Sequence, residues 1–282
     1  MGNEMKKKIF DVLRVLIVLG ACGGFTFASY SLTKTYLGYQ NADKAYEEIN
    51  NMFIQVVDED SEDVEEEGSQ EQQQTQSQSK DDKDSLSFSD DEKWVWNYNA
   101  MREYNPESLG YIKLDESRIQ YPIVQHEDNQ YYLERGSNRI SNGNGAIFVD
   151  SRIQGGLDAK SCIIYGHDML NGAMFADLLK YGNKDWCDTH QVFDIYIGYR
   201  HYRYYVFASF RADALDKDIY KMGFLDDNDY TAWIKRCMSK SNYKYPVDEP
   251  TAADKTILLS TCIDDDNLRF VVTLVRGEEV VD

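Results

Sequence analysis

Residues 256–275 read TILLSTCIDDDNLRFVVTLV, two apolar runs on either side of a polar, acidic turn. Short runs rich in β-branched and aromatic residues, bounded by turn-forming residues, are typical of β-strands. We therefore expect strands over 256–261 and 268–275, joined by a solvated turn. Cys262 then lies at the end of the first strand, and Arg269 lies near the start of the second.

The same strand pattern recurs upstream of this pair. The additional strands predicted from it are 109–114, 119–124, 145–150, 161–166, 192–198 and 201–212. Helices are expected over 91–103, 174–181 and 226–241, the last with apolar residues at helical spacing. About eight short strands with few helices predict a mainly β fold, a closed or nearly closed barrel with helical insertions.

A second apolar strand ends in a residue that can carry chemistry. Residues 161–168 read SCIIYGHD, so the strand runs into Gly166, which permits a tight turn, and His167. A cysteine thiolate attacks an amide carbonyl well, and a nearby cation favours the thiolate over the thiol. Histidine can pass a proton to a leaving amine, and arginine keeps its charge and its forked donors at any relevant pH. Cys262, His167 and Arg269 are therefore a candidate nucleophile, acid/base partner and charge stabiliser.

The cysteines suggest neither a metal site nor a disulfide framework. The chain has five cysteines among 282 residues, and none stands in a CxxC pair. Taken singly, each is typical of a small buried apolar residue. No carboxylate cluster demands calcium, so we expect no metal and no cofactor.

The N-terminus has the features of a membrane anchor. Lys6, Lys7 and Lys8 precede a mostly apolar stretch at 15–32, which is about long enough to cross a bilayer as a helix. The lysines favour a cytoplasmic N-terminus and place the rest of the chain outside the cell. Small residues near Ala28 leave a cleaved signal peptide as the alternative to an uncleaved anchor.

Most of the acidic excess lies in one segment. The net charge of the chain is −19, and residues 58–92 contain fifteen acidic residues and two lysines, a net charge of −13. This segment lacks the apolar residues needed to fold, so we expect a disordered linker, either a spacer or a tolerated insertion. The expected organisation is an anchor and juxtamembrane helix over 1–57, the linker over 58–92 and a catalytic domain over 93–282. A negative surface repels phosphates, so nucleic acid is excluded as a partner.

The spacing of these motifs resembles one family. LSTC at 259–262, followed seven residues later by the arginine of RFVV, resembles the active-site motif of sortases, and YGH at 165–167 resembles their histidine motif. GAIFVD at 145–150 and the long insertion between residues 211 and 256 are similar to class B sortases in particular. The resemblance covers roughly residues 93–280 and implies an eight-stranded sortase-type β-barrel, which would follow the transmembrane helix and the acidic linker predicted above.

The resemblance also implies a reaction. The thiolate of Cys262 would cleave a C-terminal sorting motif of secreted proteins, of the NPxTN or PxTG type, after threonine. The resulting thioester would pass to a peptidoglycan precursor amine, which anchors the protein to the cell wall. His167 would be the general acid/base and Arg269 the stabiliser, with Ser260 and Thr261 shaping the substrate groove. The enzyme would be a single-pass protein of the cell membrane with an extracellular catalytic domain.

Two alternatives remain open, and a third is disfavoured by the spacing of the motifs. A pilin-polymerising sortase would use a protein lysine as the amine, and a non-catalytic surface module would keep only the barrel. An L,D-transpeptidase would place its histidine and cysteine closer together than they are here. His126, His190 and His201 lack comparable surroundings and are interpreted as structural residues.

Overall fold

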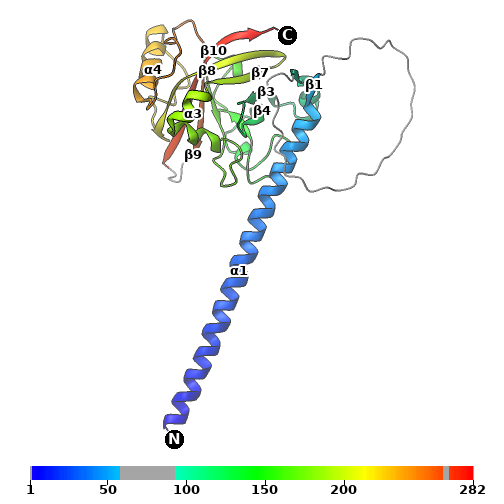
Figure 1. Cartoon of the computed structure of the whole chain (residues 1–282), viewed down its shortest axis with the longest axis vertical. Coiled ribbons are helices and arrows are strands. Elements are labelled where there is room, and N and C mark those ends of the chain that lie inside the picture. The colour runs from blue at the N-terminus through cyan, green and yellow to red at the C-terminus, as the bar shows by residue number, and fades with distance from the viewer. Residues whose placement is uncertain (1, 58–92, 263–266, 282) are drawn as a thin grey trace, which may run out of the picture.

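Eight strands close into a barrel at one end of a long N-terminal helix (Figure 1). The computed structural model describes residues 2–57, 93–262 and 267–281. The predicted acidic linker at 58–92 and the centre of the predicted acidic turn at 264–266 lie outside the described residues.

The barrel confirms the eight predicted strands. In chain order they are β3 (Ser108–Lys113), β4 (Gln120–Val124), β5 (Ile147–Val149), β6 (Ser161–Tyr165), β7 (Val192–Ile197), β8 (Arg200–Asp213), β9 (Thr256–Cys262) and β10 (Leu268–Val280). Their order around the barrel is β10-β8-β7-β3-β4-β5-β6-β9. The pairs β4/β5 and β6/β9 are parallel, and the others are antiparallel.

Alternation along the strands divides the barrel into an interior and an outer face. On β9 and β10, Leu259 and Val272 belong to the interior core, whereas Leu258 and Val271 belong to a second core on the outside. That outer core is covered by α4 (Asp227–Lys240), the predicted helix of the long insertion, which buries Trp233 among its apolar residues. The helix begins as predicted, because the Asp226 carboxylate caps it by accepting from the Asp229 amide at 2.8 Å.

The shorter helices differ from the predictions. Residues 91–103 are not one helix: Lys93–Trp96 form a strand, β2, and the helix α2 covers only Tyr98–Tyr104. The helix expected over 174–181 is instead the 3₁₀ helix η3 (Ala176–Gly182), followed by α3 (Lys184–Thr189), which sequence reasoning missed. Two further 3₁₀ turns are η1 (Tyr131–Leu133) and η2 (Gly156–Asp158).

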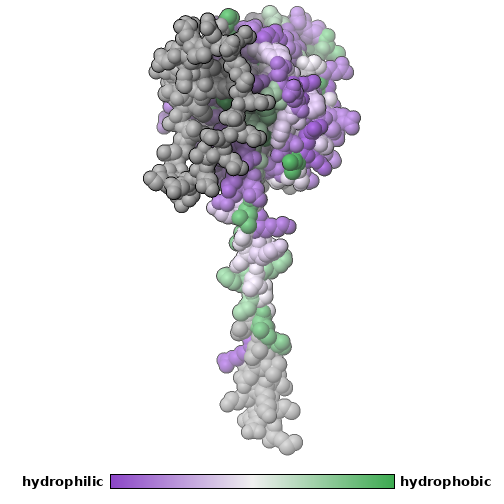
Figure 2. Space-filling model, turned by 90° about the vertical axis from the view of Figure 1, so that its right-hand side faces the viewer, coloured by the Kyte–Doolittle hydropathy of each residue, from purple (hydrophilic) through white to green (hydrophobic). Residues whose placement is uncertain are grey.

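The N-terminal helix α1 (Gly2–Phe53) extends away from the barrel along most of its length. Apolar side chains are exposed along its stem (Figure 2), among them Leu16, Phe25 and Leu32, which are 61%, 74% and 72% exposed. Within the described residues, however, no helix combines the length and apolar character that crossing a membrane requires. The expected transmembrane helix is therefore not confirmed.

The last turns of α1 belong to the barrel domain. Tyr46, Ile49 and Phe53 are at most 5% exposed and join the interior core cluster. The chain then forms β1 (Ile54–Val57), which pairs with β2 in antiparallel register, Val57 opposite Lys93. Because Val57 and Lys93 are paired, segment 58–92 leaves and re-enters the domain at one place. This geometry favours an insertion over a spacer.

Candidate active site

The strand register brings the three predicted catalytic positions to one end of the barrel. In the parallel pair β6/β9, Tyr165 is opposite Ser260, and the Gly166 amide donates to the Ser260 carbonyl at 3.2 Å. His167 and Cys262 each follow two residues after this pair. In the antiparallel pair β9/β10, Cys262 and Arg269 are Cα partners. Backbone pairing alone therefore makes these three positions neighbours.

A cavity of about 250 Å³ opens at this end of the barrel. It is lined by four of the five predicted site residues, His167, Ser260, Thr261 and Arg269. The structure describes Cys262, the fifth, by its backbone at the end of β9, directly after Thr261. The cavity is therefore bounded by residues from every motif that the sequence singled out for chemistry.

His167 is held in one tautomer. Its Nε2 lies 2.9 Å from the backbone carbonyl oxygen of Leu133. A carbonyl can only accept, so Nε2 carries the proton and donates, and Nδ1 is the ring atom that gains or loses a proton. Gly145 lies against the same edge of the ring: a Cβ built on it would be 2.9 Å from Cδ2 of His167 and 2.8 Å from the Leu133 carbonyl oxygen. Its φ of +63° also lies in the region that favours glycine, so two constraints select this residue.

Arg269 is fixed by strands on both sides. It pairs with Ala212 of β8 and with Cys262 of β9, so its backbone belongs to the closed barrel. Its Nη1 donates to the carbonyl of Leu268 at 2.8 Å, and its side chain lines the cavity. A guanidinium keeps its charge at any physiological pH, so this cavity contains a permanent cation close to the end of β9.

Ser260 and Thr261 form the cavity wall and are almost closed to solvent. Each is only 1% exposed. The hydroxyl of Ser260 is 3.0 Å from the hydroxyl of Tyr220, which lies in the insertion between β8 and α4 and also lines the cavity. The two predicted residues can therefore shape the cavity, and Tyr220 is a wall residue that sequence reasoning missed.

A buried carboxylate lies behind the wall at Tyr165. Tyr165 lines the cavity and donates its hydroxyl to Oδ2 of Asp150 at 3.0 Å. Arg152 donates to the same carboxylate from Nε at 2.9 Å and from Nη2 at 2.7 Å. Burial alone would raise the pKa of Asp150, but the hydrogen bonds from Arg152 outweigh it and hold the pKa below its usual range. Burial raises the pKa of Tyr165, which therefore stays a neutral donor.

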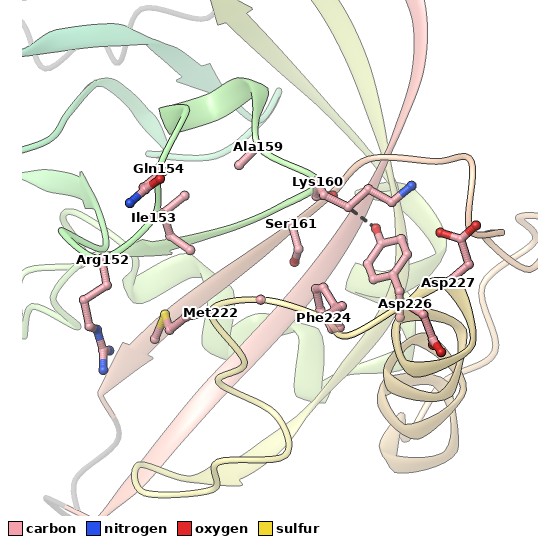
Figure 3. A pocket seen from close by; sticks show the side chains of 12 residues that line it. Arg152, Ile153, Gln154, Ala159, Lys160, Ser161, Met222, Phe224, Asp226 and Asp227 are labelled. Carbon is pink, nitrogen blue, oxygen red and sulfur yellow. Dashed lines mark hydrogen bonds between the residues drawn. The ribbon is translucent and has the colours of Figure 1, made fainter.

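A larger cavity, about 640 Å³, lies elsewhere on the outer face (Figure 3). Met222 and Phe224 face Ile153 and Ser161 across it, near the start of α4. Ser161 begins β6, so this cavity lies at the opposite end of that strand from Tyr165 and His167. None of the predicted site residues lines it. We assign the candidate active site to the smaller cavity because the predicted reactive residues line it, and cavity volume alone does not indicate catalysis.

The other histidines and cysteines have structural surroundings. His126 Nδ1 is 2.6 Å from Glu107 Oε1, and His201 Nε2 is 2.7 Å from Asp194 Oδ1. His190 is stacked on Trp186 with ring centroids 3.4 Å apart. The remaining cysteines of the barrel domain, Cys162, Cys187 and Cys237, are free and at most 1% exposed. Burial raises the pKa of the Cys162 and Cys237 thiols, which disfavours their reactive thiolates.

Sequence reasoning also missed Leu133 and Asn129, which line the cavity from the segment after β4. Leu133 acts through its backbone carbonyl, so no choice of side chain could have revealed it. Asn129 leaves a weak signal, a polar turn residue in HEDNQ at 126–130 just after a strand. Its carboxamide oxygen accepts from the Ser151 amide at 2.7 Å, which ties two cavity loops together.

The known proteins to which this chain is similar are sortases. No family model matches the chain. Among curated proteins it is 32% identical to Sortase B of Listeria monocytogenes over 164 residues, which is 57% of this chain and 65% of that protein. It is 28% identical to Sortase B of Staphylococcus aureus over 167 residues, 59% of this chain and 68% of that protein. The matched region thus spans about two thirds of the length of these relatives.

Solved structures of sortase B are matched over almost their whole length. The structure of sortase B from Listeria monocytogenes has 31% sequence identity and a TM-score of 0.57, covering 63% of this chain and 98% of that one. Sortase B from Bacillus anthracis in complex with AAEK1 has 25% identity and a TM-score of 0.66, covering 86% and 99%. The closed barrel of this chain is thus the fold of the solved sortases. Within that fold, the chain belongs to the class B sortases, a family of cysteine transpeptidases.

Proposed function

We propose that the chain cleaves a C-terminal sorting motif, of the NPxTN or PxTG type, after its threonine and transfers the protein to a peptidoglycan amine. The observation that carries this proposal is the register: Cys262 is opposite Arg269, and His167 follows the strand paired with β9. Membership of the class B sortases supports the reaction type. The solved Staphylococcus aureus sortase B–substrate complex, which is 26% identical to this chain with a TM-score of 0.60, supports a peptide substrate.

In the first half of the reaction, Cys262 is the nucleophile. Its thiolate attacks the threonine carbonyl carbon, and a carbon–sulfur bond forms as the carbonyl oxygen becomes an oxyanion. Arg269 stabilises that charge with guanidinium donors. The oxyanion then collapses, the peptide carbon–nitrogen bond breaks, and the leaving amine takes a proton from Nδ1 of His167. The product is a thioester and a released C-terminal tail.

In the second half, an amine attacks the thioester carbonyl. Nδ1 of His167, now neutral, accepts the proton that the amine loses, and the carbon–sulfur bond breaks to restore the thiolate. Because Nε2 is held by the Leu133 carbonyl in both halves, the same ring nitrogen gives and takes the proton. Ser260, Thr261 and Tyr220 form the wall against which the substrate lies.

We further propose that the protein is a single-pass membrane protein with its barrel outside the cell. The lysines at 6–8 and the apolar run at 15–32 support this orientation, and apolar side chains along that run are exposed on α1. An extracellular barrel would meet both secreted proteins and wall precursors.

The test uses the full chain in detergent micelles with a panel of fluorogenic peptides that carry different sorting motifs. We expect the wild type to cleave one motif class and Cys262→Ala to cleave none. A thiol reagent should modify Cys262 faster than the buried Cys162 and Cys237. Adding either a peptidoglycan-type amine or a lysine peptide then identifies the acceptor by the ligated product. Cleavage by Cys262→Ala at the wild-type rate would end the proposal.

A further inference from the structure

The helix that leads into the barrel domain touches both loops beside His167. Asp43 and Tyr46 are three residues apart near the end of α1 and therefore share one face of the helix. Tyr46 contacts the loop at 134–146, which precedes β5, and Asp43 contacts the loop that follows His167. The stem of α1 points away from the barrel, so these contacts come from its last turns only (Figure 1).

Tyr46 holds the backbone on which the imidazole rests. Its hydroxyl donates to the carbonyl of Gly145 at 2.6 Å and accepts from the Ser137 amide at 3.3 Å. Burial raises the pKa of Tyr46, so the hydroxyl remains protonated and able to donate. Gly145 is the residue on which a Cβ would clash with the ring of His167. The Tyr46 hydroxyl therefore fixes the position of the backbone that packs against the His167 ring.

Asp43 holds the loop on the other side. Its carboxylate accepts from Nδ2 of Asn171 at 3.0 and 3.2 Å, and Oδ2 pairs with Arg118 Nη2 at 3.4 Å. Asn171 lies at the tip of a hairpin that starts at His167, because the Phe175 amide donates to the His167 carbonyl at 2.8 Å. Oδ1 of Asp43 also accepts from Asn144 Nδ2 at 3.4 Å, next to Gly145.

We propose that Asp43 and Tyr46 are positioning residues, through which the end of α1 holds the His167 ring in its catalytic orientation. Two loops meet at that ring: Tyr46 holds the first, and Asp43 holds the second and also contacts the first through Asn144. The inference rests on the proposed role of His167 as general acid/base. It makes the N-terminal helix part of the active-site support as well as the connection to the rest of the chain.

The experiment compares Tyr46→Phe and Asp43→Asn in the full chain in micelles. Tyr46→Phe removes one hydroxyl and keeps the ring, which packs on Tyr121 with centroids 5.2 Å apart. The matched controls are Tyr36→Phe and Glu47→Gln, which change exposed residues of the same helix. We expect kcat for peptide cleavage to fall about tenfold in each test variant, the effect of losing one hydrogen bond of ordinary strength, with KM within about twofold.

A second readout reports on the ring itself. Nuclear magnetic resonance of ¹⁵N-histidine-labelled protein follows exchange of the His167 Nε2 proton with water. We expect exchange to become about tenfold faster in Tyr46→Phe and Asp43→Asn, and to stay at the wild-type rate in both controls. A purely structural role would lower thermal stability without changing this exchange in the folded protein.

The two readouts separate this inference from the proposed function. If the wild type cleaves no peptide, the proposed function fails, and the exchange measurement still decides whether α1 positions the ring. If the wild type is active and both test variants match their controls in kcat and in exchange, the positioning role is overturned. Should Tyr46→Phe not fold, the milder Asp43→Asn decides by the same criteria.

Discussion

Replacing residues 58–92 with the dipeptide Asn-Gly is expected to stabilise the protein by about 2 kcal/mol. The reason is the pairing of Val57 with Lys93, which makes the segment the loop of the β1/β2 hairpin. Asn-Gly is the preferred sequence of a two-residue type I′ turn, whose twist matches that of antiparallel strands. The strands would keep their register, and only the loop between them would shorten.

The magnitude follows from loop-closure entropy. The cost of closing a flexible loop grows as (3/2)RT ln n, so shortening the loop from the 35 residues at 58–92 to two lowers it by about 2.5 kcal/mol. Short loops deviate from this law, which is why about 2 kcal/mol is expected. For a domain of this size, 1 kcal/mol shifts the melting temperature by about 2–4 °C, so the shift is about 4–8 °C upward.

Thermal and urea unfolding followed by circular dichroism measure the change. A Gly/Ser segment of the same length is the control, because it removes the charge and keeps the loop; we expect it to unfold like the wild type within about 1 kcal/mol. A shortened variant that is less stable than the wild type would refute the hairpin reasoning. Normal cleavage of soluble peptides, combined with failure on membrane-bound substrates, would restore the spacer interpretation.

Three further predictions concern the core, the acid limit of stability and the site. Ile49→Ala, which empties a buried position on α1, is expected to lower the unfolding free energy by about 2–4 kcal/mol in urea titrations, against no change for exposed Glu48→Ala. Asp150 has a folded-state pKa below its usual 3.8, so its stabilisation is present above that pH and is lost as pH falls through the folded value. Asp150→Asn should therefore lower the unfolding free energy at pH 7 by about 2 kcal/mol. It should also make the unfolding free energy depend less steeply on pH below pH 4, and equal pH slopes in wild type and variant would contradict the lowered pKa of Asp150. Arg269→Lys keeps the charge and loses the fork, so kcat/KM for peptide cleavage should fall about 100-fold, and an unchanged value would remove Arg269 from oxyanion stabilisation.

The barrel was predictable because its strands have a clear local pattern. Along residues 256–261 and 268–275 apolar residues are nearly continuous, and the acidic turn between them marks where pairing stops. The convergence of the candidate site residues was predictable for a related reason. Cys262, His167 and Arg269 each follow or begin such a run, and residues at the ends of neighbouring strands lie together whatever the details of the loops.

What could not be predicted depends on partners distant in the chain. The acidic and aromatic residues at the start of 91–103 predict a helix that includes residues 93–96. These four residues form a strand instead, because they pair with residues 54–57, which precede the acidic segment in the chain. The run at 54–57 is too short to show a strand periodicity, so the sequence does not reveal this pairing. Leu133 contributes a carbonyl, and Tyr46 contributes a hydroxyl about 100 residues before the loop it holds. Local patterns do not contain this information.

The continuity of α1 has a consequence for how the proposed enzyme would meet the membrane. The helix runs without a break from Gly2 to Phe53, and the face that includes Ala42 and Tyr46 is buried against the domain. Between the apolar run that ends at residue 32 and the first buried position at 42 there are about 15 Å of helix. Under the proposed anchoring, the barrel is then held at a fixed height and orientation by this continuous helix. A substrate that is itself tethered near the membrane would reach such a site at a defined distance. A flexible spacer between the anchor and the barrel would instead let the cavity sample many heights, but residues 58–92 come after the helix and not within it.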